Sequence, residues 1–474
     1  MKISKFFCDS LLSVSSNLFS FAVGALVLLL VPKLIGVEEY SNYQLYNFYL
    51  GFVGFFHFGW SDGFFLKYAG KDQKEFHPSV ITGHLFFFSF FEFFLWIVIF
   101  VVFYRTCTED SSELILYSIC VSAFLILVNN FLRLVMQCSR QFAEYSFSLS
   151  FERLLFLLFI AFFFFYYRRN YSSLIFAFIL SQTFAMFLSV FLLRDKFTRS
   201  FSLSSVLPDI KSCTLAGLVL MLSGILPMII IGTARLGIEK HWGLIAFGKV
   251  SLLLSTVSIL FVFVYSVASV LLPTLRSSGR TYVLNSFLLL RSTISWLLLF
   301  SFVFARLAQL LLSWWLPEYA DILLYLPFVI PICFFQGVST LTTETYLKTF
   351  RKEILILLGN FIAFFCACLL FYVSIYLLNS LKATIITIVL AMALRLFILD
   401  FLLSLSLGIR CYDCQCFECL AIFAFLILHL FSPSLVSSLL YAFFLVALFV
   451  YWSSGHRDIL HALYTLLRSK IRFS

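Results

Sequence analysis

The sequence predicts an all-α polytopic membrane protein with about fourteen transmembrane helices, arranged as two six-helix lobes and two further C-terminal helices. Three observations predict this fold: the composition, the spacing of long apolar runs, and an internal repeat. Of the 474 residues, 62% are hydrophobic and only 12% are charged, and the mean hydropathy is +1.03. A soluble domain of that composition would expose large apolar patches.

The long apolar runs each approach the roughly 20 residues that a helix needs to cross a bilayer core. They are solid runs such as LLFLLFIAFFFF, and they lack the alternating polarity of transmembrane barrel strands. No break between them is long enough for a soluble domain, so the function is expected to lie in the bilayer. The predicted spans are 9–31, 43–61, 80–103, 113–135, 148–167, 171–193, 213–232, 243–272, 284–311, 321–342, 354–378, 382–405, 417–432 and 434–452.

Lys and Arg are unevenly distributed between alternate breaks. Twenty-one of them lie in the set of breaks that includes both termini, and eight lie in the other set. Because cytoplasmic loops carry an excess of these residues, both termini are predicted to be cytoplasmic. The net charge of +10 is therefore attributed to topology and not to nucleic-acid binding, which would need a basic patch. The C-terminal stretch HRDILHALYTLLRSKIRFS predicts an amphipathic basic helix in contact with membrane lipids at the inner leaflet.

An internal repeat relates the two lobes. The stretch KLIGVEEYSNYQLY aligns with ARLGIEKHWGLIAF, and this register places Gly36 opposite Gly237. Six spans separate the copies, so both halves have the same orientation and are related by an axis along the membrane normal. The predicted division is 1–200 for the first lobe (spans 1–6), 201–408 for the second (spans 7–12), and 409–474 for spans 13–14 and the tail.

Two short motifs flank the second predicted span, one before it and one at its end. Their positions are Gly36, Glu38 and Tyr40, then Phe58, Gly59, Asp62 and Gly63. The stretch that contains them, from Val31 to Lys71, resembles the first helical hairpin of bacterial O-antigen and capsule flippases. That family belongs to the multidrug/oligosaccharidyl-lipid/polysaccharide (MOP) exporter superfamily.

The resemblance implies a two-lobed transporter, and not an enzyme, in a bacterial inner membrane. Such a transporter moves undecaprenyl-pyrophosphate-linked oligosaccharide repeat units of O-antigen, capsule or a similar polysaccharide from the cytoplasmic to the periplasmic leaflet. A polysaccharide polymerase and a chain-length regulator are the implied protein partners, and no cofactor is expected. The related lipid II flippases carry arginines in their first two helices, whereas spans 1 and 2 here contain none, so anion capture is expected from other helices.

Charged residues inside the spans are candidates for substrate binding, because a charge in the hydrocarbon is costly unless it faces water or a partner. Glu92 lies near mid-bilayer in the aromatic stretch FFFSFFEFFLW, and Arg291 lies at nearly the equivalent place in the second half. The two are expected to meet across a central cavity, where Arg291 would bind the pyrophosphate and Glu92 would supply its counter-charge. The alternatives are a structural pair or a buried, neutral Glu92.

The other cations within or at the edges of spans are Arg133, Arg153, Arg395 and Lys249. A guanidinium binds phosphate bidentately, so a ring of arginines near the cytoplasmic side suits capture of a pyrophosphate. Arg133 and Arg153 could instead extend to the interface. Asp400 is a possible counter-ion of Arg395, although their spacing is not ideal for one helix face. Neutral polar residues in the spans could bind sugar hydroxyls or join helices by hydrogen bonds: Asn129, Asn130, Gln182, Gln336 and Asn360.

Four cysteines stand close together in CYDCQCFEC as Cys411, Cys414, Cys416 and Cys419. Tetrathiolate zinc sites usually place a long segment between two Cys-x-x-Cys arms, whereas one residue separates the arms here, so no metal is predicted.

Two other functions stay open at this point. An ion-coupled multidrug antiporter of the same superfamily would favour twelve spans without the last two. A membrane polysaccharide polymerase or ligase would present a large periplasmic loop, which this sequence lacks. If spans 13 and 14 form a groove for the polyprenyl tail, truncation near Gly408 should leave two inserted halves that no longer transport.

Overall fold

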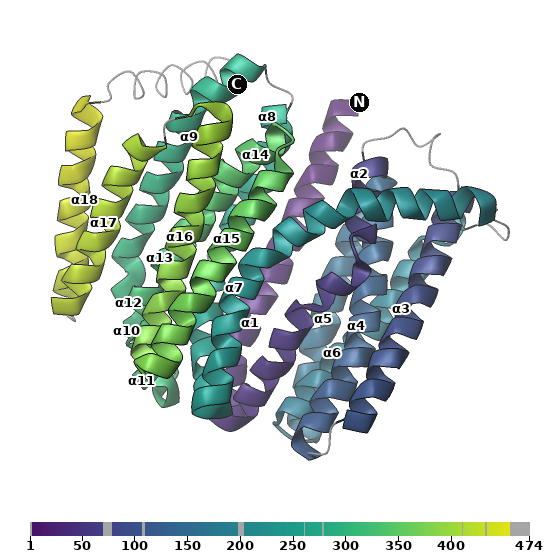
Figure 1. Cartoon of the computed structure of the whole chain (residues 1–474). Coiled ribbons are helices and arrows are strands. Elements are labelled where there is room, and N and C mark those ends of the chain that lie inside the picture. The colour runs from purple at the N-terminus through teal and green to yellow at the C-terminus, as the bar shows by residue number, and fades with distance from the viewer. Residues whose placement is uncertain are drawn as a thin grey trace. The chain divides into compact units, whose positions relative to one another are not determined.

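The computed structural model describes residues 2–69, 78–106, 110–197, 203–259, 261–276, 279–409, 411–431 and 434–455. Within these ranges the chain is helical apart from short turns, and no strand occurs in them (Figure 1). The all-α prediction is therefore confirmed. The predicted amphipathic tail, 456–474, lies outside the described residues.

The described chain divides into two compact units. The first comprises Met1–Met228 and Trp242–Leu252, and the second comprises Ile229–His241 and Leu253–Ser474. The long helix α7 contributes to both units. The two C-terminal helices belong to the second unit.

The elements follow one another along the chain in the order coloured in Figure 1. Those that precede α7 are α1 (Lys2–Gly51), η1 (Val53–His57), α2 (Trp60–Tyr68), α3 (Pro78–Thr106), α4 (Asp110–Cys138), α5 (Phe142–Tyr166), α6 (Tyr171–Leu192) and η3 (Arg194–Lys196). The next are α7 (Leu203–Ser258), α8 (Phe261–Arg276), α9 (Arg280–Ser301), η4 (Phe302–Phe304), α10 (Ala305–Trp315), η5 (Pro317–Tyr319), α11 (Ala320–Leu323) and α12 (Leu326–Val329). The last are α13 (Pro331–Val338), η6 (Ser339–Glu344), α14 (Thr345–Thr349), α15 (Glu353–Tyr372), η7 (Val373–Leu377), α16 (Leu381–Leu407), α17 (Tyr412–Phe431) and α18 (Leu435–Gly455).

Twelve helices among the described residues are long and apolar enough to cross a membrane. Two of them, Ser15–His57 and Val206–Ser258, each contain parts of two predicted spans. Both are interrupted by a glycine in a backbone conformation that is nearly exclusive to glycine, Gly36 at φ 79° and ψ 174° and Gly243 at φ 84° and ψ 177°. When these two helices are divided at their glycines, the count reaches the fourteen spans that the sequence predicts.

Gly36 and Gly243 have nearly the same backbone conformation. The internal repeat predicted from the sequence places Gly36 opposite Gly237, which lies within regular helix a few residues before Gly243. Each of the two long helices therefore contains one glycine that interrupts it, although the interruption in α7 does not fall on the glycine that the repeat aligns.

The glycines of the second motif bring α2 and α7 into backbone contact within the first unit. A Cβ atom added to Gly63 would lie 1.7 Å from the carbonyl oxygen of Cys213, and one added to Gly59 would lie 2.5 Å from the amide nitrogen of Leu218. On the facing helix, a Cβ at Gly217 would lie 2.0 Å from the carbonyl oxygen of Gly59. The sequence GWSDG is thus a small-xxx-small pattern that lets two helices approach closely.

Replacing Gly63 with Ala is expected to separate α2 from α7 and to lower the melting temperature of the detergent-purified protein. The clash is with backbone, which cannot rotate away, so the cost should reach or exceed the about 1–3 kcal/mol of an overpacked core. Gly224→Ala in α7 is the matched control, because a Cβ there meets nothing within 4 Å. Equal melting temperatures for the two variants would contradict this packing.

The second unit contains a span that is broken into short pieces. A proline occupies the first or second position of each of three short helical elements: Pro317 in η5, Pro327 in α12 and Pro331 in α13. Proline interrupts the span because it lacks the amide donor that a continuous helix requires. The π-helical turn η6 follows directly after α13. The predicted span 321–342 therefore corresponds to four short elements, α11, α12, α13 and η6, and not to one straight helix.

The two C-terminal helices pack on α9 through aromatic rings. The Trp296 ring stacks on Phe417 of α17 with centroids 5.0 Å apart and planes 7° apart. The same indole meets Phe449 and Trp452 of α18 edge-on, at 5.1 and 6.0 Å. These helices are therefore an integral part of the second unit.

Candidate functional site

Arg291 of α9 lies fully buried between two carboxylates of the second unit. Its Nη1 atom is 2.7 Å from Asp400 Oδ2 on α16. Its Nε and Nη2 atoms donate to the two oxygens of Glu418 on α17 at 3.0 and 2.8 Å, which is the bidentate pairing that a guanidinium forms with a carboxylate. Ser295 donates to Glu418 at 2.6 Å, and Thr343 donates to Asp400 at 2.6 Å. The charge is thus paired, and the carboxylates are further hydrogen-bonded.

Arg395 of α16 forms a second buried group. Its Nε atom donates to Asn360 Oδ1 on α15 and its Nη1 atom to Gln336 Oε1 on α13, both at 2.8 Å. Its Nη2 atom donates to Glu344 at the end of η6. Glu344 also pairs with Lys348, whose Nζ is 3.2 Å away one turn later. One guanidinium therefore joins three helical segments.

The two groups are connected, because α16 carries both Arg395 and Asp400 while η6 carries the adjacent Thr343 and Glu344. We refer to them together as the unit-2 charge network. A π-helical turn is often found at functional sites, and here it allows consecutive residues to reach separate partners. The network contains three cations and three carboxylates, so its charges balance: Arg291, Arg395, Lys348, Asp400, Glu418 and Glu344.

The structure brings together residues that the sequence analysis named, but with different partners. The counter-charges of Arg291 are Asp400 and Glu418, where Glu92 was expected. The counter-ion of Arg395 is Glu344, where Asp400 was expected. The physical reason is that a buried cation takes the carboxylate that helix packing places nearest, and that pairing joins distant parts of the chain.

Glu92 of α3 is completely buried in the first unit. Within the described chain neither of its carboxyl oxygens has a hydrogen-bond partner. Its surroundings are aromatic: Phe88, one turn earlier, stacks on Phe131 of α4 at 4.6 Å, and Trp96, one turn later, packs on Phe56 at 4.8 Å. An ionised carboxylate without a partner is far more costly to bury than a neutral one. This environment favours the neutral acid.

Replacing Glu92 with Gln is expected to leave membrane insertion and thermal stability unchanged within about 1 kcal/mol, because the amide has the shape of the neutral acid. Replacing it with Lys should prevent accumulation of folded protein, since an ammonium would be buried without a counter-charge. Membrane fractions and melting temperatures of the two variants test this. A folded Glu92→Gln protein that has lost transport would contradict a passive role for Glu92.

The arginines of the first unit differ in exposure. Arg133 of α4 is buried, and its Nη2 atom pairs with Glu152 on α5 at 2.6 Å. Its Nε atom donates to Ser148, whose hydroxyl reaches Ser189 of α6 at 2.8 Å. Arg153 keeps 34% of its side chain exposed, and its Nε atom lies 3.8 Å from Glu152, beyond hydrogen-bond distance. Arg133 therefore holds three helices together, and Arg153 is the more accessible guanidinium.

Other residues named from the sequence lie apart from the charge network. Lys249 is half-buried on α7. Asp62 lies in the first turn of α2, with its Oδ2 atom 3.9 Å from His57 Nε2. Asn129 donates to the side-chain and backbone oxygens of Gln182 at 2.8 and 3.0 Å, so this pair joins α4 to α6. For Asn129 and Gln182 the interhelical alternative is the one that the structure shows.

The first motif shapes the turn between the two halves of α1. Gly36 provides the break, and Tyr40 is buried just after it. Glu38 is exposed, whereas its neighbour Glu39 is half-buried. The Glu39 carboxylate accepts a hydrogen bond from the Tyr171 amide at 2.8 Å. That amide begins α6, where a carboxylate is favoured by the unpaired amides of the helix start. The sequence comparison did not single out Glu39.

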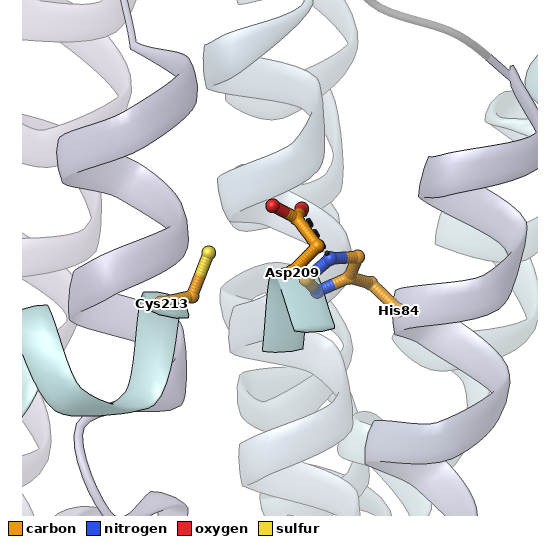
Figure 2. A group of neighbouring side chains, drawn as sticks. All are labelled: His84, Asp209 and Cys213. Carbon is orange, nitrogen blue, oxygen red and sulfur yellow. Dashed lines mark hydrogen bonds and ion pairs between the residues drawn. The ribbon is translucent and has the colours of Figure 1, made fainter. Parts of the chain in front are cut away.

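A second polar cluster fastens the start of α7 to α2 and α3. Asp209 of α7 accepts from Lys67 and Tyr68 of α2 and from His84 Nε2 of α3, the last at 2.9 Å. Trp60 donates to His84 Nδ1 at 3.0 Å. Figure 2 shows the His84 ring beside the Asp209 carboxylate. Asp209 is far from the other residues in the sequence, so no local sequence pattern predicts the cluster.

His84, Asp209 and Cys213 also offer a nitrogen, an oxygen and a sulfur within 4.8 Å of one another (Figure 2). Their hydrogen bonds do not suit a metal ion. Because Trp60 donates to Nδ1 of His84, the other ring nitrogen carries the proton and faces Asp209. Lys67 occupies the second carboxylate oxygen. The arrangement fits a hydrogen-bonded fastening between helices.

Among the four cysteines of CYDCQCFEC, Cys411 and Cys414 are buried, whereas Cys416 and Cys419 are exposed. In the part of the chain that the structure describes, these thiols do not gather into a group that could hold a metal ion.

Solved structures with a similar fold include a lipid II flippase and a multidrug resistance transporter of the MOP superfamily. The lipid II flippase MurJ, in an inward closed conformation, matches with a TM-score of 0.66 and 14% identity, covering 96% of this chain and 100% of its own. An inward-facing multidrug resistance MATE family transporter matches with a TM-score of 0.63 and 13% identity, covering 84% of this chain and 99% of its own. A MATE structure in complex with MaD5 matches with a TM-score of 0.60 and 14% identity, covering 84% of this chain and 94% of its own.

The chain thus has the fold of a multi-pass membrane transporter. The fold is similar to that of a transporter described as a member of the MOP superfamily, and the first-hairpin resemblance pointed to the same superfamily. No model of a protein family matches the sequence, and no curated protein matches it.

Proposed function

We propose that this protein is a flippase that moves a lipid-linked oligosaccharide, carried on undecaprenyl pyrophosphate, from the cytoplasmic to the periplasmic leaflet of a bacterial inner membrane. The observation that carries the proposal is the similarity to a lipid II flippase over 96% of this chain and 100% of that chain. The MATE structures match 84% of this chain. The first-hairpin resemblance to O-antigen and capsule flippases supports an oligosaccharide as the cargo.

The integration of α17 supports the same proposal. A helix that served only as an added anchor would need no charge in its buried face, yet α17 contributes Glu418 to the pair with Arg291. Burying an ion pair is costly unless its geometry is good. The pair between Glu418 and Arg291 therefore indicates that α17 must hold a fixed position relative to α9. A groove beside these helices would hold the polyprenyl tail while the head group crosses.

For the pyrophosphate, we propose Arg153 as the capturing residue. Arg291, Arg395 and Arg133 are buried and already paired with carboxylates, so they would have to exchange those partners to bind an anion. Arg153 is partly exposed and has only a distant carboxylate contact. Its guanidinium can therefore offer two parallel donors to a phosphate at little cost. Lys249 is a further candidate for the same unit, as a point charge.

The proposal includes the orientation and the partners expected from the sequence. The excess of Lys and Arg in one set of breaks supports a cytoplasmic location for both termini. A polysaccharide polymerase and a chain-length regulator would receive the exported repeat units of O-antigen, capsule or a related polysaccharide.

An ion-coupled multidrug antiporter is the second candidate, because the match to the MATE transporter of the MOP superfamily extends over 99% of that transporter's chain. Overexpression in a drug-sensitive strain distinguishes the two functions. An antiporter would raise the tolerated drug concentration several-fold, and a flippase would leave it unchanged.

A bacterial strain that lacks its own lipid-linked oligosaccharide flippase tests the proposal in cells. Complementation with this gene is expected to restore surface polysaccharide, and Arg153→Gln should restore much less while inserting normally. Arg168→Gln is the matched control, because Arg168 is an exposed arginine that follows the end of the same helix, α5. Failure to restore polysaccharide in strains that together cover varied repeat units would contradict the proposal.

A further inference from the structure

The first unit has an apolar groove between α1 and α5, with a volume of about 330 Å³. Its walls are aliphatic and aromatic side chains, and one charged residue lies among them, Arg169. The residues that define it are Leu26, Leu30 and Leu34 of α1, and Leu157, Ala161 and Phe165 of α5.

The groove has the length of one bilayer leaflet. On α1 it runs from Leu26 to Leu34, which is about 12 Å of helix, close to half of a hydrocarbon core of roughly 30 Å. It ends near Gly36, where α1 is interrupted, and near Tyr166, where α5 ends. Arg169 therefore stands at the end of the groove where the helices reach the membrane surface. The distribution of Lys and Arg makes that surface the periplasmic one.

Arg169 is exposed, and within the described chain no carboxylate lies within ion-pair distance of it. The nearby carboxylate of Glu39 is engaged by the Tyr171 amide. Tyr166 and Tyr167, beside Arg169, are exposed as well, and tyrosines are enriched at the level of lipid head groups. The groove thus combines a leaflet-long apolar wall with an unneutralised cation at head-group depth.

We propose that this groove binds one acyl chain of an anionic phospholipid of the periplasmic leaflet, with the lipid phosphate on Arg169. A phosphodiester carries one negative charge, which matches the single cation of the groove, whereas a pyrophosphate would leave charge without a partner. Attraction of an anionic lipid to one surface cation is worth about 1 kcal/mol, or about fivefold in occupancy. The site is independent of the transported molecule.

Photoreactive lipids test the site directly. The protein is placed in phosphatidylcholine vesicles that contain either a phosphatidylglycerol or a phosphatidylcholine probe, each with a diazirine in one acyl chain. Peptide mapping then measures labelling of residues 26–34 and 157–165. We expect the phosphatidylglycerol probe to label these peptides about fivefold more than the phosphatidylcholine probe, and Arg169→Gln should remove that preference.

Two variants sharpen the result. Arg168→Gln removes an adjacent arginine that does not line the groove, and it should keep the preference. Ala161→Trp fills the groove from an exposed position and should reduce labelling by both probes. Equal labelling by the two probes, or a preference that survives Arg169→Gln, would overturn the proposal. Displacement of the phosphatidylglycerol probe by undecaprenyl pyrophosphate at lower concentration would overturn the assignment of the occupant.

Discussion

Replacing Arg291 with Met is expected to cost the protein about 3–5 kcal/mol of stability and to abolish transport. Removal of the guanidinium leaves Asp400 and Glu418 buried without a counter-charge, and it takes three contacts from them. Arg291→Lys should recover only part of the stability, because an ammonium keeps the charge but cannot form the bidentate contact with Glu418. Melting temperatures of the detergent-purified variants measure the effect.

A neutralised variant separates the loss of charge balance from the loss of side-chain volume. Arg291→Met combined with Asp400→Asn and Glu418→Gln removes all three charges, so it should recover most of the lost stability. If the single Arg291→Met variant inserts and melts like the unmodified protein, the ion pairs contribute nothing to the second unit. That result would return Arg291 to the role of a free substrate ligand, as the sequence analysis had it.

Truncation after Gly408 is expected to lower the stability of the protein nearly as much as Arg291→Met, although the sequence predicted two halves that still insert. It removes Glu418 and the Gln415 amide that donates to Asp400 at 2.9 Å. The unit-2 charge network then keeps three cations and only two carboxylates, and an uncompensated buried charge costs several kcal/mol. Truncation after Phe431 removes α18 and the residues that follow it but retains Glu418, so most of the folded protein should remain. Similar yields of monodisperse protein from both truncations would contradict this view of α17.

Both units are held together internally by buried ion pairs. Arg133 and Glu152 link α4 to α5 in the first unit, and the unit-2 charge network links segments from α9 to α17 in the second. Alternating access in transporters with internal repeats is largely rigid-body movement of one bundle against the other. Units of this kind need strong internal contacts, and paired arginines supply them where the hydrophobic effect does not act between helices.

The sequence predicted the helical membrane fold, the span count and the charged residues that matter, because each has a local signal. A long apolar run identifies a span by itself, and a charge inside such a run is conspicuous. Arg133, Arg291 and Arg395 were all found this way, and each is buried in the structure.

Partners could not be predicted, because they depend on how the helices pack. Glu344 and Glu418 lie near the ends of apolar runs and resemble ordinary interfacial residues in the sequence, yet both are buried. Asp209 and His84 meet only because α7 begins beside α3. The pairing of Glu92 with Arg291 relied on similar depth in the two halves, and depth alone does not select a partner.

The central claim, that this protein flips a lipid-linked oligosaccharide, is tested most directly with the purified protein in sealed vesicles. Vesicles are prepared with undecaprenyl-pyrophosphate-linked oligosaccharides that differ in the sugars of their repeat unit. A sugar-cleaving or sugar-oxidising reagent that cannot cross the membrane reports the fraction of oligosaccharide exposed on the outer leaflet. If the protein is a flippase, inner-leaflet oligosaccharide of at least one repeat unit will become accessible over time, and Arg153→Gln will slow this exchange strongly. If the inner-leaflet pool stays protected for every oligosaccharide while the protein is folded and correctly inserted, the claim is wrong.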